Sequence, residues 1–331
     1  MNLPNRRTIH EGDMVILYER KDSLIPITVT KGEKYSCILG AFCHDDMIGK
    51  EYGSIIISQT GNKYMYLLEP TPELWSSCMK TRTQIIFTMD ASVILFHLFI
   101  KPGSRVVESG TGSGALSTDI ARVLYPMGHL FTFEYNEMRA REAKAEFSRN
   151  HLDSIISVFH RDAYQDGFIV EDADPSLCVD EAHSVDAVFL DLPKPYAAIQ
   201  HASRVLRRNG RICCFSPCIE QVQENCKALR DSGYELIETI EVLLREYELN
   251  SIENNNSYTV RNQNAKGQVK RETVSTELAD VEKEDVQETT PSLFVGSKSV
   301  RECLSSIALS KGEHIGRGHT AYLTFARSEE R

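Results

Sequence analysis

The chain has 331 residues and a formal net charge of −10, with 41% hydrophobic and 25% charged residues. This composition is ordinary for a globular protein, and its acidity argues against a chain that binds nucleic acid unaided. The acidity is uneven, because residues 271–290 hold seven acids and two bases, a net of −5 and so half of the total. We expect the folded body to be nearer neutral, so that a basic surface for nucleic acid, where one is needed, would come from a second chain.

Neither a secretory leader nor a membrane span is expected. Residues 1–7 have no apolar core, and the most apolar segment, 85–100, is too short for a bilayer. We therefore expect a soluble intracellular protein without a membrane partner. The nine cysteines have the spacing of neither a zinc site nor a disulfide framework. We expect reduced thiols and no metal, with the adjacent Cys213 and Cys214 on opposite faces of a strand.

Residues 1–75 differ from the rest of the chain. Short apolar runs at 14–18, 25–29, 54–57 and 64–68 are separated by turn signals. Such short strands are typical of a small β-barrel or sandwich. We identify no catalytic residue in this β-rich domain, which could cradle RNA or pack against the main domain.

The stretch 104–136 carries the clearest chemistry. A β-branched run ends at Glu108, and glycines follow at alternate positions, Gly110, Gly112 and Gly114. Glycine permits a positive φ and a close approach of the backbone to a ligand. After a helix over 115–124, a strand at 129–133 delivers Glu134. Its carboxylate is placed to accept hydrogen bonds from the ribose hydroxyls of a nucleotide.

Two readings of this stretch stay open. The pattern Gly110-x-Gly112-x-x-Ala115 satisfies a relaxed dinucleotide motif, which is compatible with an NAD-linked oxidoreductase. S-adenosylmethionine (SAM) is favoured because Glu108 would repel a pyrophosphate but could hold water or the ammonium of a methionine. A second reason is the tract Asp-x-Pro-x-Pro-Tyr from Asp191 to Tyr196, at the end of a buried strand. It is similar to the signature of methyltransferases that act on amino groups and ring nitrogens.

Residues 76–249 otherwise alternate between strands and helices. Further strands are expected at 155–159, 185–190, 211–215 and 236–244, the third of them after an Asn209-Gly210 turn. Further helices are expected from Asp90 to about Lys101 and at 136–150, 196–207 and 219–231. Asp162 follows the strand at 155–159, where it could bind the adenine amino group of SAM or cap a turn.

The remaining segments are less regular. We expect a surface loop at 164–184 and a compositionally disordered insertion at 250–310. Residues 311–331 contain an apolar strand, 321–325, which would pair antiparallel with 236–244 and complete the sheet. The fold class is therefore α/β, a Rossmann-like class I methyltransferase domain with a small N-terminal β-rich domain.

Six strings extend the likeness along the chain. They are Pro70-x-Pro72-Glu73-Leu74-Trp75, Arg82-Thr83-Gln84-Ile85, Glu108 to Gly114, Phe189-Leu190-Asp191-x-Pro193-x-Pro195, Phe215 to Val222 and Gly318 to Ala326. Together they resemble the catalytic subunits of tRNA (adenine-58) N1-methyltransferases, a SAM-dependent class I family. The resemblance covers about residues 10–247 and 316–327.

The resemblance implies transfer of a methyl group from SAM to N1 of a T-loop adenosine of tRNA, with Asp191 as the catalytic residue. It implies cofactor contacts at Ile86, Glu108, Gly110, Gly112, Ser113, Gly114, Ala115, Glu134, Arg139, Asp162, Ala163 and Asp191. It implies substrate contacts at Gln84, Pro193, Tyr196, Ser216 and His319. It also implies a non-catalytic, methyltransferase-like partner in a heterotetramer of two of each, and a nuclear location, although no localisation signal is visible.

The chemistry demands orientation more than acid–base catalysis, because a neutral ring nitrogen displaces a sulfonium in line. Asp191 could bind the exocyclic N6 amino group of adenine and stabilise the cation formed by alkylation of N1. The turn at Pro193 and Pro195 would hold that carboxylate in place, and Tyr196 could stack on the base.

Departures from the family pattern leave the RNA affinity open. Lys194 places a charge between the two prolines, residues 246–249 replace a Tyr-Asn-Val-Arg-like stretch, and the insertion is long. Another SAM enzyme, such as an isoaspartyl-protein O-methyltransferase, would not require the tract that begins at Asp191. A non-enzymatic scaffold subunit with a decayed fold is a third possibility, against which the intact set of glycines and carboxylates argues.

Overall fold

The computed structural model describes residues 8–20, 23–172, 174, 177–181, 184–243, 247–253, 258–263, 269–274, 306–312 and 319–329. The chain divides into two compact units. The first is Met1–Leu243 with His319–Arg331, and the second is Leu244–Gly318.

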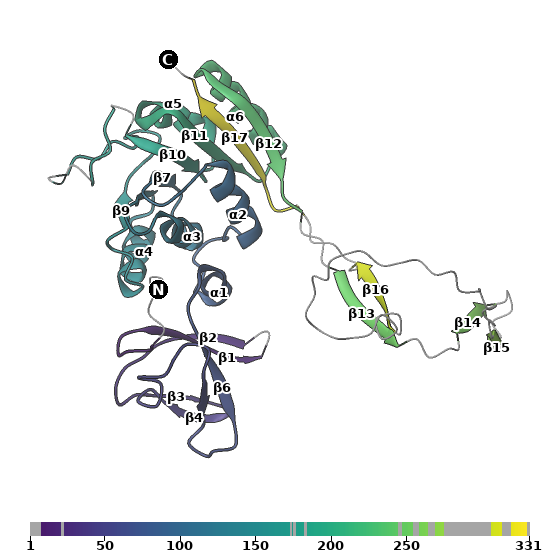
Figure 1. The fold of residues 1–331 in the computed structure, drawn as a ribbon. Helices are drawn as coiled ribbons and strands as arrows, with labels where there is room; N and C mark the ends of the chain where they lie inside the picture. Colours follow the sequence, from purple (N-terminus) through teal and green to yellow (C-terminus); the bar gives the residue numbers. More distant parts are fainter. Residues whose placement is uncertain are drawn as a thin grey trace, which may run out of the picture. The chain divides into compact units, whose positions relative to one another are not determined.

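The first unit begins with a four-stranded antiparallel sheet (Figure 1). Its order is β2-β1-β6-β5, with β1 at Met14–Arg20, β2 at Ser23–Thr28, β5 at Ile55–Ile57 and β6 at Tyr64–Leu68. A hairpin of β3 (Lys34–Cys37) and β4 (Gly40–Cys43) accompanies it. Alternate side chains form a buried cluster that includes Val15, Leu17, Ile56, Met65 and Leu67. The predicted β-rich N-terminal part is confirmed, and β3 and β4 are the two strands that the apolar runs did not indicate.

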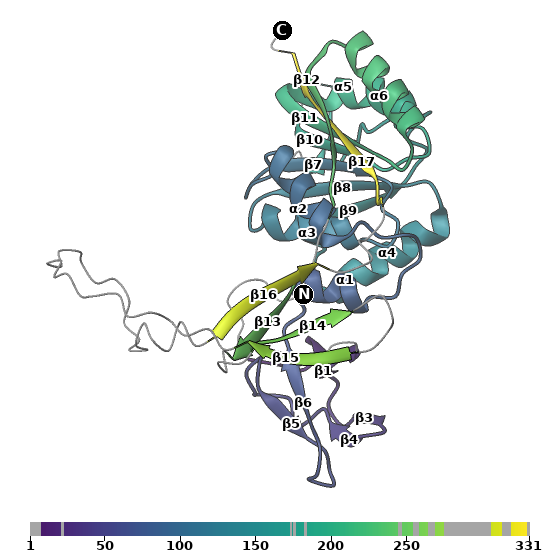
Figure 2. The same cartoon turned by 90° about the vertical axis from the view of Figure 1, so that its right-hand side faces the viewer.

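The central sheet has seven strands in the order β12-β17-β11-β10-β7-β8-β9. All pairs are parallel except those of β17, which runs antiparallel to both of its neighbours. Figure 2 shows β11, β10, β7, β8 and β9 following one another across this sheet. The strands are β7 (Arg105–Ser109), β8 (His129–Glu134), β9 (Ile156–His160), β10 (Val185–Leu190), β11 (Leu206–Ser216), β12 (Tyr234–Glu241) and β17 (Tyr322–Ser328). The predicted Rossmann-like fold is thereby confirmed.

Helices cover both faces of the central sheet. One buried cluster joins α1 (Pro72–Cys78), α2 (Thr88–His97), α3 (Ala115–Leu124) and α4 (Glu137–Arg149) to the sheet. The other cluster joins α5 (Pro195–Val205) and α6 (Ile219–Asp231) to the opposite face. Adjacent strand residues alternate between the clusters, so that Cys213 lies in the first and Cys214 in the second, as expected.

The largest differences from the predicted element boundaries are at α2 and β11. Helix α2 begins at Thr88 rather than at Asp90, and it ends at His97 because Phe99 takes a φ of +53°. The Asp90 side chain is buried in the first turn and accepts a hydrogen bond from Thr320. Strand β11 runs through the expected turn, although Asn209 does adopt the left-handed φ of +58° that such a turn uses.

The segment at 164–184 is more than a surface loop. Phe168, Val170 and Val179 are buried in the cluster below α5, and Val170 forms an isolated bridge with Val179. Glu171 and Asp172 between them are exposed. The many acids of this segment therefore concealed a few apolar residues that enter the core.

In the second unit, β13 (Tyr247–Glu253) pairs antiparallel with β16 (Ser306–Gly312), and β14 (Tyr258–Gln263) pairs with β15 (Val269–Val274). Parts of the segment 250–310, for which composition indicated disorder, thus lie in strands. The disorder of the segment as a whole stays a prediction. Residues 275–305 lie outside the described residues, as does Glu246. The domain boundaries at 75, 249 and 310 stay predictions.

No helix in the described part of the chain is long and apolar enough to cross a bilayer. Among the same residues there is no group of three or more histidine, cysteine, aspartate or glutamate side chains that could hold a metal ion. Eight described cysteines are free thiols.

Replacing Phe168 by alanine should lower the free energy of unfolding by about 3–5 kcal/mol, because the ring is fully buried against Phe133. Denaturant titration measures this loss. The matched control, Phe96→Ala, removes a ring that is 72% exposed and should cost less than about 1 kcal/mol. Equal losses would contradict the burial of the 164–184 segment.

Candidate cofactor and substrate site

A cavity of about 570 Å³ opens at the carboxyl ends of β7, β8 and β10. The chain proceeds from β7 outward to β8 and β9, and then returns to place β10 on the other side of β7. Ligands of open α/β sheets bind at such a point of reversal. The lining residues are Thr83, Gln84, Ser109, Gly110, Gly112, Glu134, Tyr135, Arg139, Arg161, Asp162, Ala163, Tyr164, Asp191, Leu192 and Pro193.

The glycine loop between β7 and α3 is shaped by its contacts with the protein itself. A Cβ at Gly110 would lie 2.1 Å from the backbone oxygen of Asp191, and one at Gly112 would lie 2.6 Å from Oγ1 of Thr83. A Cβ at Gly114 would lie 2.8 Å from the Phe147 ring. All three glycines have positive φ, of +99°, +54° and +81°. The loop therefore needs glycine for its conformation and its packing, in addition to any approach of a ligand.

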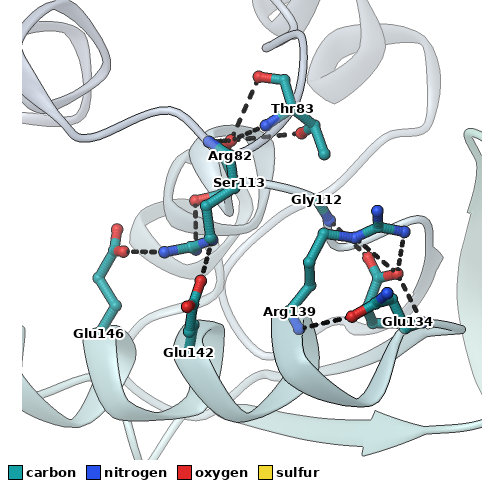
Figure 3. A network of polar contacts seen from close by, with 9 residues as sticks. Arg82, Thr83, Gly112, Ser113, Glu134, Arg139, Glu142 and Glu146 are labelled. Carbon is teal, nitrogen blue, oxygen red and sulfur yellow. Dashed lines mark hydrogen bonds and ion pairs between the residues drawn. The ribbon is translucent and has the colours of Figure 1, made fainter.

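Glu134 ends β8 as a hydrogen-bonded acceptor. Its Oε2 accepts the backbone N–H of Gly112 at 3.0 Å, and its Oε1 accepts that of Asn136 at 2.9 Å. The Arg139 guanidinium donates to Oε1 from Nε at 3.1 Å and from Nη2 at 2.7 Å (Figure 3). Asn136 caps α4 by accepting the N–H of Arg139. The carboxylate is thus fixed between the glycine loop and α4.

Arg82 connects the segment before α2 to the glycine loop by hydrogen bonds (Figure 3). The backbone N–H groups of Arg82 and Thr83 donate to Oγ of Ser113 at 2.7 and 2.9 Å. The guanidinium donates to the Ser113 carbonyl at 3.0 Å and to Glu146 of α4 at 2.5 Å. Arg82 and Glu146 are both largely buried. This contact holds Thr83 and Gln84 at the edge of the cavity.

Glu108 lies below the glycine loop, away from the main cavity. Its Oε2 accepts hydrogen bonds from Ser117 at 2.5 Å and from Thr132 at 2.7 Å. Burial raises its pKa to about 7, and these two hydrogen bonds oppose the rise. The side chain borders a small recess of about 30 Å³ that shares Gly110, Gly112 and Asp191 with the cavity.

Asp191 stands at the end of β10, where its backbone N–H donates to Ser109 at 2.9 Å. Burial raises the pKa of its carboxyl to about 6, and the charge of Glu134 adds to the rise. The turn that follows is held from two sides. The Tyr164 hydroxyl accepts the N–H of Lys194 at 2.9 Å, and Nε2 of Gln221 donates to the Pro193 carbonyl at 3.0 Å.

Most of the predicted site residues come together. Nine line the cavity, namely Gln84, Gly110, Gly112, Glu134, Arg139, Asp162, Ala163, Asp191 and Pro193. Five more border the recess, namely Ile86, Glu108, Ser113, Gly114 and Ala115. Tyr196, Ser216 and His319 border neither. The Asp162 carboxylate accepts the N–H of Tyr164 at 2.9 Å, which is the turn cap considered from the sequence.

Three predicted substrate residues have other surroundings. Tyr196 packs against the cluster of α5, and the buried Ser216 accepts a hydrogen bond from Asn225 at 2.9 Å. Nδ1 of His319 bonds to Glu241 at 2.6 Å and Nε2 bonds to the Pro217 carbonyl at 3.1 Å. The hydrogen bond to Glu241 raises the pKa of His319, because both ring nitrogens face acceptors and the imidazolium donates to both. Their substrate roles stay predictions.

Sequence reasoning assigned no role to six lining residues, Thr83, Ser109, Tyr135, Arg161, Tyr164 and Leu192. Each is a direct neighbour of a predicted residue in the sequence, and this adjacency was the available signal. Tyr135 directly follows Glu134, and its side chain is 71% exposed. The bond between Tyr164 and Lys194 joins residues 30 positions apart, which no local pattern indicates.

Comparison with known proteins places this geometry in a family. Residues 63–328 match the model of the tRNA methyltransferase complex GCD14 subunit, and residues 8–56 match the TrmI-like N-terminal model. The chain belongs to the GCD14 family. This membership does not favour the NAD-linked or isoaspartyl-directed alternatives.

Two curated relatives are similar to the chain over nearly their whole length. The chain is 42% identical over 330 residues to the tRNA (adenine(58)-N(1))-methyltransferase catalytic subunit trmt61a of Dictyostelium discoideum, covering 98% of this chain and 97% of the relative. It is 37% identical over 329 residues to the TRM61 catalytic subunit of Candida albicans, covering 96% of each.

Solved structures share the fold. A SAM-dependent O-methyltransferase from Thermotoga maritima has a TM-score of 0.67 and 25% identity, covering 98% of this chain and 96% of that one. The tRNA (m1A58) methyltransferase TrmI from Aquifex aeolicus has a TM-score of 0.63 and 20% identity, covering 98% of this chain and all of that one.

Ser113→Ala should weaken SAM binding at least about tenfold, because it removes the acceptor of two backbone N–H groups whose loss costs about 1–3 kcal/mol each. Isothermal titration of the purified chain measures the affinity. Ser92→Ala is the matched control, since Ser92 bonds to the Met89 carbonyl on the exposed side of α2. An unchanged SAM affinity in Ser113→Ala would show that the hydrogen bonds from Arg82 and Thr83 to Ser113 do not support the cofactor loop.

Glu108→Gln should remove a pH dependence of stability. Because burial raises the pKa of Glu108 from 4.5 to about 7, the folded wild-type protein holds a proton more tightly than the unfolded chain. The free energy of unfolding should therefore fall between pH 4.5 and 7, by up to about 3 kcal/mol from this group. Gln keeps an oxygen acceptor for Ser117 and Thr132 without the charge. Thermal melts from pH 4 to 8 that fall equally in both proteins would exclude Glu108 as the cause.

Proposed function

We propose that the chain transfers a methyl group from SAM to N1 of the T-loop adenosine at position 58 of tRNA. The observation that carries the proposal is the position of Asp191, a partly buried carboxylate at the edge of a cavity that the glycine loop and Glu134 also line. The relatives named for this reaction match nearly the whole chain.

The cavity fits SAM in size and charge. Its volume of about 570 Å³ lies within the range of roughly 300–1,000 Å³ for small-molecule sites. Three carboxylates line it, Glu134, Asp162 and Asp191, against the two guanidinium groups of Arg139 and Arg161, so the balance favours a cation there. Glu134 would hold the ribose hydroxyls, Asp162 and Ala163 the adenine, and the backbone of Gly110 to Ala115 the remainder.

When bound, SAM supplies an electrophilic methyl group. The task of the protein is then to hold adenine with its N1 lone pair directed at that methyl group. Asp191 would accept a hydrogen bond from the N6 amino group and so orient the base. Alkylation of N1 makes the base cationic, and the carboxylate stabilises this charge or accepts a proton from N6. Tyr164 and Gln221 keep the turn after Asp191 in place.

The acidic chain would act with a second subunit. The relatives are named catalytic subunits, and the matching family model describes a subunit of a tRNA methyltransferase complex. We infer a non-catalytic, methyltransferase-like partner that supplies basic RNA-binding surface, in a heterotetramer of two of each, and we infer a nuclear location. Light scattering of the co-expressed complex tests the stoichiometry, and imaging of a tagged chain tests the location.

Asp191→Asn should lower kcat for tRNA methylation by at least about a hundredfold, because it removes the charge that stabilises the alkylated base. Transfer of labelled methyl from SAM to unmodified tRNA is measured with the co-expressed partner, and reverse-transcription arrest locates the modified base. SAM binding should persist because Glu134 and the glycine loop remain, although the loss of one negative charge beside a cationic ligand should weaken it severalfold.

Asp153→Asn, on the exposed turn before β9, is the control and should retain wild-type kcat. Lost SAM binding in Asp191→Asn would instead make Asp191 a cofactor or folding residue. Arrest at a base other than the T-loop adenosine, or no transfer by the wild-type complex, would refute the proposed substrate.

A further inference from the structure

The outer face of the N-terminal sheet carries aromatic side chains that no buried cluster uses. Tyr18 of β1 pairs with Tyr66 of β6, which pairs in turn with Ile55 of β5. Tyr64 pairs with Ile57 beside them. Because paired residues of an antiparallel sheet point to the same side, these five side chains form one surface.

This surface, called here the tyrosine face, is open to solvent. Tyr64 is 55% exposed and Ile57 is 52% exposed, whereas Met65 and Leu67 on the other side of the same strands are buried. The rings are in contact, with centroids 6.2 Å apart for Tyr18 and Tyr66 and 5.6 Å apart for Tyr64 and Tyr66. A contiguous exposed patch of this kind marks an interaction site.

Basic residues adjoin the strands of the tyrosine face in the sequence, in a chain whose net charge is −10. Lys63 directly precedes Tyr64, and Arg20 ends β1; both are exposed. Nζ of Lys50 donates to the carbonyl of Ile55 at 2.8 Å. Glu19, the acid of β1, accepts a hydrogen bond from Ser23.

We propose that the tyrosine face binds unpaired nucleotides of the RNA substrate. Exposed aromatic rings on a sheet are the surface on which single-stranded bases stack, and flanking lysine and arginine side chains neutralise the phosphates between them. A hydrophobic protein partner is the alternative occupant, but it would need only an apolar face and no neighbouring basic residues. The inference rests on the proposed function for the identity of the RNA, a tRNA, and adds a second contact region remote from Asp191 in the sequence.

The test uses the full chain co-expressed with its partner and an unmodified tRNA transcript. Tyr64→Ser combined with Tyr66→Ser should weaken tRNA binding at least about tenfold, because each stacked base contributes a large fraction of such affinity. SAM affinity and the mass of the complex should stay unchanged. Ile38→Ser is the matched control, since Ile38 is a fully exposed apolar residue in the turn of the neighbouring hairpin.

A second variant separates the contribution of the basic side chains to tRNA affinity from that of the aromatic rings. Arg20→Gln combined with Lys63→Gln should reduce the slope of log affinity against log salt by about 1.4, at about 0.7 per phosphate contact on a single strand. Should the double tyrosine variant unfold, Tyr64→Ser alone is measured, since this more exposed ring should still account for a severalfold loss.

The outcomes distinguish this inference from the proposed function. Unchanged tRNA affinity in the tyrosine variants, with wild-type methyl transfer intact, would overturn the inference alone. A smaller complex that accompanies the loss of affinity would show that the face binds the partner subunit, and would also overturn it. Failure of the wild-type complex to bind tRNA would overturn both.

Discussion

The site depends on one steric constraint, the close approach of the ends of β7 and β10. Gly110 lies so close to the backbone carbonyl of Asp191 that the Cβ of any other residue at this position would be 2.1 Å from the carbonyl oxygen. The Asp191 N–H bonds to Ser109 at the same junction. The glycine is therefore what brings the cofactor loop and the carboxylate expected to face the substrate to a common edge. The contact at Thr83 and the ring of Phe147 then fix the course of the loop toward α3.

A second consequence of this convergence is electrostatic. Glu108, Glu134 and Asp191 end or nearly end three neighbouring strands, and burial together with mutual repulsion raises the pKa of Glu108 and of Asp191. Like charges in a low-dielectric site are costly until a cation enters. The free protein is thus prepared for a positively charged ligand, and the neutral product of demethylation would be held less strongly by the same groups. Arg139 already offsets part of this charge at Glu134.

Local sequence patterns predicted those site residues that lie at or just after the ends of strands. Glu134 closes a short apolar run, Asp191 directly follows one, and Asp162 lies two residues after the end of β9. A parallel sheet brings such strand ends together without further information. Contacts between distant parts of the chain left no local signal. Arg82 meets Glu146 across 64 positions, and Tyr164 meets Lys194 across 30. The core residues of the 164–184 segment were hidden among acids, and the start of α2 was misplaced because Asp90 is a buried first-turn residue rather than a cap.

The last strand of the sheet has a consequence for the order in which the chain can fold. Strand β17 lies between β11 and β12, yet the unit Leu244–Gly318 is synthesised before it. During translation β12 has no neighbour in the sheet until β17 has been synthesised, so completion of the sheet waits until the whole intervening unit has been made. The cost of closing the intervening loop grows only logarithmically with its length, by about 0.6 kcal/mol per doubling. Evolution can therefore lengthen or shorten this insertion while the sheet keeps its architecture.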